Sequence, residues 1–286
     1  MTAMRGGLVA AALVAGGCFG KPDFSGVPGD ARLDSGGGHD DAAGDAPVPD
    51  GCVGAWGQPM LRHELDGLVA GEPTITADLQ TLYFAKQITG TSWEIHWADR
   101  GDATSAFTPR GRAPFDLNGS AHDQDPSVTD DGLMVIFRDG PSGSIKQAVF
   151  SGTWTVTNVP GLDALAPSSL ELSGDGLTFY WSTNGTLHIA RRGTRTTAFV
   201  EDPATFGSNI HWPTVTGDGL HLYYTMLPST YGVYEATRTT PTAAFAGSTM
   251  LLGSSYHDPD VTSDGAVMIV GERLDTTVAI MRRDCP

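Results

Sequence analysis

The sequence WPTVTGDGLHLYY, residues 212–224, decides the fold because related stretches occur four more times in the chain. The others are EPTITADLQTLYF (72–84), DPSVTDDGLMVIF (125–137), SLELSGDGLTFYW (169–181) and DPDVTSDGAVMIV (258–270). Successive repeats are 53, 44, 43 and 46 residues apart, measured between the central aspartates Asp78, Asp131, Asp175, Asp218 and Asp264. A period in the forties built from short strands is typical of a β-propeller, in which each repeat forms one blade.

Each repeat predicts four antiparallel strands. A short first strand leads to an Asp-Gly turn, which suits a tight hairpin because glycine accepts positive φ. An apolar and aromatic second strand follows, then a loop and a third strand. An aromatic residue opens the fourth strand in four repeats: Phe107, Trp154, Phe199 and Phe245. The first repeat reads Asp78-Leu79-Gln80 without glycine, so we expect its turn to be longer.

The fifth repeat lacks room for a fourth strand, because only 22 residues follow Asp264. Trp56 lies 22 residues ahead of Asp78, and the matching aromatic-to-aspartate gaps elsewhere are 24, 21, 19 and 19 residues. We therefore expect an all-β, five-bladed β-propeller of four-stranded antiparallel blades, in which the N-terminal strand closes the last blade. Such closure removes exposed sheet edges. A ring of six blades is the alternative.

The chain is strongly acidic, with 17 Lys and Arg against 33 Asp and Glu and a formal charge of −16. This charge repels phosphate backbones, so nucleic acid is not an expected partner. No apolar run approaches the ~20 residues that span a bilayer. We expect a monomer.

The N-terminal region differs from the rest of the chain. Residues 1–17 have one positive charge, Arg5, ahead of a short apolar stretch, which is typical of a secretory signal peptide. Residues 18–51 are rich in Gly, Pro, Ala and Asp, and we expect a disordered acidic tether there. Residues 52–286 then form the propeller.

The sequence VAGGC, residues 14–18, resembles the lipobox of bacterial lipoproteins. The resemblance implies that Cys18 carries lipid and anchors the protein to a membrane of the cell envelope. Phe19 follows in place of an aspartate, which favours the outer membrane over the inner one if enterobacterial sorting applies. An ordinary cleaved signal peptide, giving a secreted or periplasmic protein, is the alternative.

The two remaining cysteines, Cys52 and Cys285, lie at the first and next-to-last positions of the propeller region. A signal peptide implies an oxidising compartment, where we expect these two thiols to form a disulfide that locks the ring. Two free thiols or an intermolecular bond are the alternatives.

The repeat core, P-x-x-S-x-D-G followed by an aromatic strand, resembles the WD40-like repeats of the TolB type. The resemblance covers residues 52–286, although Leu170 replaces the proline in the third repeat. Six or seven blades are familiar in that group, so the number five comes from this sequence. Some members are lyases that hold a metal with histidines in the channel. For this chain, that is an analogy at the level of the fold only.

The residues at the start of each inner strand are expected to converge on the channel. The candidate ligand site there consists of Glu72, His122, Asp125, His211, Trp212, His257 and Asp258. Imidazoles beside carboxylates suit a divalent cation, for which His122, His211 and His257 are the candidate ligands. A water-filled acidic funnel without any cofactor is the alternative.

Two further sets of residues are predicted to have different roles. The loops between second and third strands are expected to form a binding surface through Trp93, Arg138, Met226, Tyr231 and Arg273. A structural role, covering blade edges or pairing with acidic turns, is expected for the arginines that recur after third strands, Arg100, Arg192, Arg238 and Arg283.

No sequence motif of a serine hydrolase, zinc protease, phosphate-binding loop or dinucleotide site is present. The sequence therefore favours a membrane-anchored binding or scaffold module for protein or glycan. A carbohydrate lyase or hydrolase that acts in the funnel, with or without metal, is the alternative function.

Overall fold

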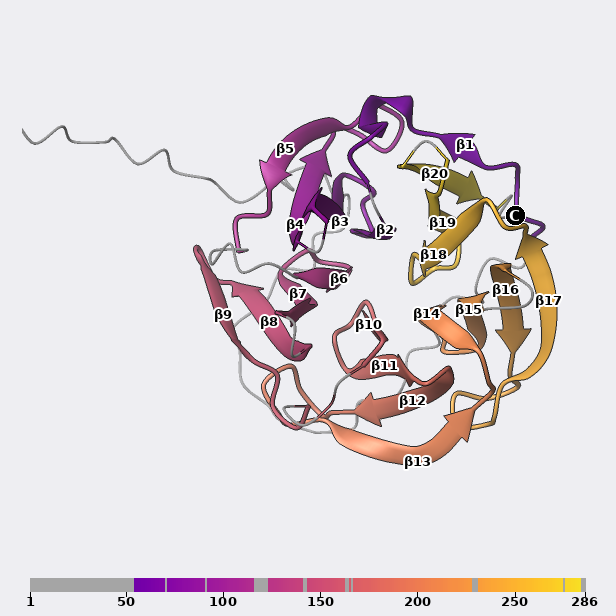
Figure 1. Ribbon diagram of the computed structural model, residues 1–286. Helices are drawn as coiled ribbons and strands as arrows, with labels where there is room; N and C mark the ends of the chain where they lie inside the picture. The colour runs from indigo at the N-terminus through magenta and orange to yellow at the C-terminus, as the bar shows by residue number, and fades with distance from the viewer. Residues whose placement is uncertain are drawn as a thin grey trace, which may run out of the picture.

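The computed structural model of the chain describes residues 54–69, 71–90, 92–115, 123–140, 143–162, 165, 167–227, 231–274 and 276–283. These residues form five four-stranded antiparallel sheets around a central axis, together with one short 3-10 turn, η1 (His63–Leu65). No helix among them is long or apolar enough to cross a bilayer. The prediction of an all-β propeller with five blades, and not six, is confirmed (Figure 1).

Each blade runs from the axis outward in chain order. Blade 1 contains β2 (Gly71–Ile75), β3 (Thr81–Thr89), β4 (Ser92–Asp99) and β5 (Thr108–Arg112). Blade 2 contains β6 (Gln124–Val128), β7 (Met134–Asp139), β8 (Ser144–Phe150) and β9 (Trp154–Asn158). Blade 3 contains β10 (Ser169–Leu172), β11 (Thr178–Thr183), β12 (Thr186–Arg191) and β13 (Val200–Phe206). Blade 4 contains β14 (Ile210–Val215), β15 (His221–Met226), β16 (Gly232–Thr237) and β17 (Ala246–Leu252).

Blade 5 joins the two ends of the propeller, as predicted. Its inner strands are β18 (Tyr256–Val261), β19 (Val267–Glu272) and β20 (Thr277–Arg282), and its outer strand is β1 (Met60–Leu61). Met60 pairs with Ile280, and Trp56 forms a further antiparallel bridge with Arg283. Figure 1 shows β1, from the start of the described chain, beside β20 at its end. The ring is therefore closed by a sheet made from both ends of the propeller.

The turn between first and second strands has the same hydrogen bonds in all five repeats. A Ser or Thr hydroxyl donates to the turn aspartate two residues later, and that carboxylate accepts the backbone N–H two residues further on. Glycine at the next position has positive φ in four turns, for example 72° at Gly219. The prediction of a longer first turn is wrong, because Leu79 takes the same left-handed backbone, with φ 62°, in a turn of equal length.

Five hydrophobic clusters fill the five spaces between neighbouring blades. The cluster between blades 3 and 4, for example, packs Tyr180 and Ile189 against Val215, Leu222 and Tyr224. A cluster of the same kind joins blade 5 to blade 1 through Ile269, Ile280 and Leu82. Since each apolar face is buried against a neighbour, no blade is independent of the ring.

The recurring arginines cover aromatic rings rather than pair with acidic turns. Arg100, Arg192 and Arg238 are 7, 7 and 8% exposed. Each guanidinium lies 4.2 to 4.3 Å from the centroid of the aromatic ring that precedes the outer strand, Phe107, Phe199 and Phe245 respectively. Each Nε also donates to a carbonyl oxygen of the Asp-Gly turn region, as in Arg192 to Gly176 at 2.8 Å. The prediction of a structural role is confirmed, but the side-chain partner is an aromatic ring and not an acidic turn.

Candidate functional site

The mouth of the axial channel is built on strained backbone. The residue before proline on four inner strands has positive φ: Glu72 (56°), Asp125 (51°), Trp212 (47°) and Asp258 (48°). At the same points the register of each inner strand slips against its neighbour, as in a β-bulge. Such a conformation costs roughly 1–3 kcal/mol per non-glycine residue, so the surrounding contacts must hold it. Blade 3 has Ser169 at this place, without positive φ.

Side chains of neighbouring blades provide those contacts. Asp258 Oδ2 accepts the backbone N–H of Glu72 at 2.9 Å, and Glu72 Oε2 accepts the N–H of Asp125 at 2.6 Å. The N–H of Trp212 likewise donates to Ser169 Oγ at 2.9 Å. The acidic residues at the channel mouth therefore hold one blade to the next.

A second ring, two residues deeper in the channel, repeats this arrangement. The backbone N–H of Ile75 donates to Asp260 Oδ2 at 2.8 Å, and that of Leu172 donates to Ser127 Oγ at 2.8 Å. Ser127 in turn donates its hydroxyl hydrogen to Glu171 Oε2 at 2.9 Å. The channel wall is thus joined by side-chain bonds at two levels.

These contacts leave little free space on the axis. The cavity between the inner strands measures about 20 Å³, which is close to the size of one water molecule. Asp125 and Asp258 are only 2 and 4% exposed, and the Oδ1 atom of Asp258 has no hydrogen-bond partner among the described residues. The side chain of Trp212, which also lines this cavity, interacts with Asp125. The site has the room and the polar groups for one small, polar occupant.

Burial changes the acidity of the channel carboxyl groups. Loss of solvent, with the nearby charges of Asp125 and Asp258, raises the pKa of Glu72 well above its usual range. Burial also raises the pKa of Asp125 to about 6, against the opposing charge of Arg138. Deeper in the channel, burial raises the pKa of Glu171, with help from Asp260, whose own pKa burial raises to about 7. Near neutral pH this interior therefore holds protons.

Two of the three histidines predicted near the mouth, His211 and His257, lie within the described residues. His257 Nδ1 is 2.8 Å from Asp258 Oδ2, and this carboxylate raises the pKa of His257 although burial alone would lower it. Burial lowers the pKa of His211, whose ring lies 5.7 Å from that of Trp212. His122 lies outside the described residues. Within the described ranges no three His, Cys, Asp or Glu side chains are placed to share a metal ion, so a cation here stays a prediction.

Among the other residues predicted for this face, Arg138 and Tyr231 contact residues of the channel mouth. Arg138 Nε lies 2.9 Å from Asp125 Oδ2, and its Nη2 donates to Gln124 Oε1 at 2.7 Å. Tyr231 packs its ring against His257, with Arg273 4.5 Å above the centroid of the tyrosine ring. Of the two remaining residues, Trp93 lies on β4 of blade 1 and Met226 lies at the end of β15 of blade 4.

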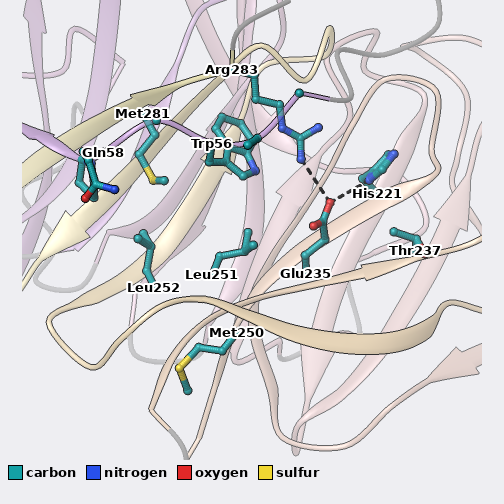
Figure 2. A pocket seen from close by; sticks show the side chains of 14 residues that line it. Trp56, Gln58, His221, Glu235, Thr237, Met250, Leu251, Leu252, Met281 and Arg283 are labelled. Atoms are coloured by element: carbon teal, nitrogen blue, oxygen red, sulfur yellow. Dashed lines mark hydrogen bonds and ion pairs between the residues drawn. The ribbon is translucent and has the colours of Figure 1, made fainter.

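A larger hollow lies elsewhere, between blades 4 and 5 (Figure 2). We call it the blade 4/5 groove, and its volume is about 690 Å³, within the range of small-ligand sites. One side consists of the segment before β1 and the end of β20, and the other of strands β15 to β17. It is lined by Gly54, Ala55, Trp56, Gly57, Gln58, Pro59, His221, Glu235, Thr237, Met250, Leu251, Leu252, Met281 and Arg283.

Glu235 is the central polar residue of the groove. Its Oε1 atom accepts a hydrogen bond from His221 Nδ1 at 2.9 Å, and Arg283 Nη2 lies 3.3 Å away (Figure 2). It also accepts a hydrogen bond from the Tyr223 hydroxyl at 3.0 Å. Burial alone would raise the pKa of Glu235, but these three donors lower it below the usual value. A fixed, ionised carboxylate therefore faces the groove.

Sequence reasoning found the channel residues and missed the groove. Channel residues recur in each repeat and were visible as a pattern, whereas the groove is made by residues of separate repeats and of the closing segment. One signal was present: Glu235 occupies a position that is Trp97, Gln147, Ile189 or Ile280 in the other blades. His221 likewise replaces Thr81, Met134, Thr178 or Val267. An acid and an imidazole that appear once among five repeats mark a special place.

The remaining predicted sites fall outside the described residues. These are the lipid-bearing Cys18, the cysteine pair Cys52 and Cys285, the signal peptide 1–17 and the tether 18–51. They remain predictions from the sequence.

Comparison with known proteins gives only distant likenesses. No protein-family model matches the chain, and no curated protein is similar to it in sequence. Among solved structures, TolB from Acinetobacter baumannii is 16% identical with a TM-score of 0.45, over 75% of this chain and 54% of that one. The chain thus spans about half the length of that TolB chain.

Two other solved structures are similar to the same degree. A gluconolactonase from Xanthomonas campestris is 9% identical with a TM-score of 0.45, over 77% of this chain and 88% of that one. A chain of a nidogen/laminin complex is 13% identical with a TM-score of 0.44, over 70% of each chain. Likenesses of this size assign neither a family nor an activity.

Proposed function

We propose that this protein is a membrane-anchored lipoprotein of the bacterial envelope whose propeller binds a protein or a glycan. The proposed binding surface is the blade 4/5 groove and not the axial channel. One contrast carries the proposal: the channel leaves about 20 Å³, whereas the groove offers about 690 Å³. The channel carboxylates already hold neighbouring blades together, so they serve the scaffold.

The anchor and the partner class rest on the sequence. VAGGC at residues 14–18 supports lipid on Cys18, and the acidic stretch that follows would keep the propeller away from the membrane surface. The formal charge of −16 disfavours nucleic acid as a partner. Many unrelated functions occur on propellers, so the groove and not the fold supports the binding role.

Photocrosslinking in intact envelopes tests the location of the binding surface. A benzophenone side chain at Met250, which is 48% exposed in the groove, should form adducts with an envelope component. The same group at His211, beside the channel mouth, should not. Digestion of the adduct by a protease or a glycosidase identifies the class of partner. Adducts formed from position 211 alone would contradict the proposal.

The anchor has its own test. Replacing Cys18 by Ser should move the protein from the membrane fraction to the soluble fraction, because a single lipid-bearing residue would be lost. Unchanged partitioning of Cys18→Ser would remove the lipoprotein part of the proposal and leave the groove untouched.

A funnel enzyme acting on carbohydrate is the second candidate, and one observation favours it. Burial raises the pKa of both Glu72 and Asp125, as in acid and base catalysts that work near neutral pH. Metal analysis of the purified protein, followed by glycan turnover in His211→Ala and His257→Ala, tests it. No bound metal and no change in turnover would leave this candidate without support.

A further inference from the structure

The centre of the blade 4/5 groove offers a ligand a hydrogen-bond acceptor. Glu235 is ionised, so it accepts hydrogen bonds only, and the Nδ1 atom of His221 must carry the hydrogen that it donates to Oε1. A hydroxyl group can either donate to the Nε2 atom of His221 or accept a hydrogen bond from it. Oε2 of Glu235 has no hydrogen bond to any described residue. The fitting ligand therefore donates hydrogen bonds, which hydroxyl groups do and fully ionised phosphates do not.

The wall beside these acceptors is aromatic and rigid. The guanidinium of Arg283 lies 4.3 Å from the centroid of the Trp56 ring, and Tyr223 meets Trp56 edge to face at 5.8 Å. Arg283 also donates to the Tyr223 hydroxyl, which ties this cluster to blade 4. Trp56 is partly buried against the cluster between blades 4 and 5 as well as by Arg283, and the part of its ring that stays exposed lines the groove beside Met281 (Figure 2).

The charge of the groove argues against two other ligand classes. A lysine or arginine side chain that approached Glu235 would also approach Arg283, whose Nη2 is 3.3 Å from the same carboxylate. An anionic ligand would meet an ionised Glu235 and a chain of formal charge −16. A neutral ligand that combines an apolar face with a rim of hydroxyl groups meets neither difficulty.

A sugar ring has this combination, because its C–H groups form an apolar face and its hydroxyls project around the rim. We propose that the blade 4/5 groove binds a neutral saccharide, with a sugar ring against Trp56 and its hydroxyls hydrogen-bonded to Glu235 and His221. This inference rests on the proposed function and narrows its ligand from protein or glycan to neutral glycan. The size of the groove allows one or a few sugar units.

Titration of the purified full chain with cellobiose, maltose and N,N′-diacetylchitobiose tests this inference, with calorimetry and ligand-observed NMR as readouts. At least one of the three should bind, and Trp56→Ala and Glu235→Gln should each weaken that binding roughly tenfold or more. Trp154→Ala is the matched control, because Trp154 opens the outer strand of blade 2 as Trp56 precedes that of blade 5. Binding by Trp154→Ala should match that of the unmodified protein.

A second variant protects the test against a folding defect in Trp56→Ala. Met250→Arg alters a half-exposed groove position that supports no buried contact of the closing segment, and it should block the groove while the protein stays folded. Loss of binding in Met250→Arg, with unfolding unchanged, supports the inference.

Three results would overturn the saccharide inference. They are no binding of any of the three sugars, binding that survives Trp56→Ala and Met250→Arg, and Glu235-dependent binding of a lysine-rich peptide in place of sugars. If sugars fail while the benzophenone at Met250 still captures a protein in the envelope, the proposed function stands and only the saccharide is wrong. If that crosslink also fails, both are wrong.

Discussion

Arg238 shows how one side chain can serve several parts of a blade. Its Nε donates to the carbonyl oxygen of Gly219 in the turn, and its guanidinium lies 4.2 Å from the centroid of the Phe245 ring at the outer strand. The side chain is 8% exposed, so both contacts are made away from solvent. Residues that recur in this way connect the inner turn of a blade to its rim.

Truncating this arginine should therefore destabilise the protein. Arg238→Ala leaves a buried carbonyl oxygen without its donor and removes the cation–π contact, so we expect a loss of ~2 kcal/mol in the free energy of unfolding. Urea denaturation measures it. Arg110→Ala is the control, because the side chain of Arg110 is 49% exposed and forms only a surface ion pair with Asp99. Its loss should change the free energy of unfolding by less than ~0.5 kcal/mol. Equal effects of the two variants would argue against the role given to Arg238.

The buried carboxyl groups of the channel should make stability fall as pH rises. Burial raises the pKa of Asp125 to about 6 and that of Asp260 to about 7, from an ordinary 3.8. The folded form then binds these protons more tightly than the unfolded chain. Their stabilising contribution is complete below about pH 4 and is lost as the pH rises toward 7.

We therefore expect a larger free energy of unfolding at pH 5 than at pH 8, measured by urea denaturation. Asp260→Asn cannot ionise and keeps an oxygen for the N–H of Ile75, so it should flatten this dependence. Asp66→Asn, at an exposed position, is the control that should leave the dependence unchanged. A protein that becomes more stable between pH 5 and pH 8 would contradict this account of the channel.

At the scale of elements, the segment before blade 1 decides whether the ring is closed. β1 pairs with β20 through Met60 and Leu61, and Trp56 packs into the cluster between blades 4 and 5. Without this segment β20 would present an open edge, and the apolar face it covers would meet water. The outer strand of blade 5 therefore contributes more to the stability of the fold than its two paired residues suggest.

Deleting residues 1–61 should lower the free energy of unfolding by at least ~3 kcal/mol, the usual cost of removing a large packed aromatic residue. Deletion of residues 1–51 alone, which leaves Trp56 and β1 in place, is the control and should leave unfolding unchanged. Comparable unfolding of the two truncated proteins would show that β1 and Trp56 do not close the ring.

The predicted disulfide belongs to the same closure. The bridge between Trp56 and Arg283 holds the two ends of the propeller together. Cys52 lies four residues before Trp56, and Cys285 lies two residues after Arg283. Mass spectrometry of peptides under non-reducing conditions should find the two cysteines linked, and reduction should cost roughly 5 kcal/mol of stability in the chain-entropy model. Free thiols at both positions in protein taken from the envelope would refute the pairing.

At the scale of the molecule, the sequence was sufficient for the ring and insufficient for the groove. The turn aspartates and the position of Trp56 give the number of blades and the closing strand, because both are local patterns repeated along the chain. Convergence of Glu72, Asp125 and Asp258 also follows from their repeated place. The hydrogen bonds by which these residues join neighbouring blades could not be predicted. They depend on bulges with positive φ, and a residue before proline gives no sign of such a bulge in the sequence.

The blade 4/5 groove depends on spacing between blades at the rim, which no local pattern encodes. Glu235 and Met250 lie on neighbouring strands of blade 4, and ring closure brings Trp56 beside them from the other end of the propeller. A search of the repeat alignment for residues that occur once would have pointed to Glu235 and His221. That rule separates the residues that build the propeller from those that we propose to bind its ligand.

Hydroxyl-radical footprinting of the full chain, purified and in native envelopes, tests most directly whether the groove is the binding surface. Methionine and tryptophan side chains react readily with the radical, and both surfaces carry them. The account predicts protection of Trp56 and Met250 in the envelope, with Trp212 at the channel mouth unchanged. Protection of Trp212 with Trp56 and Met250 equally reactive in both states would contradict it.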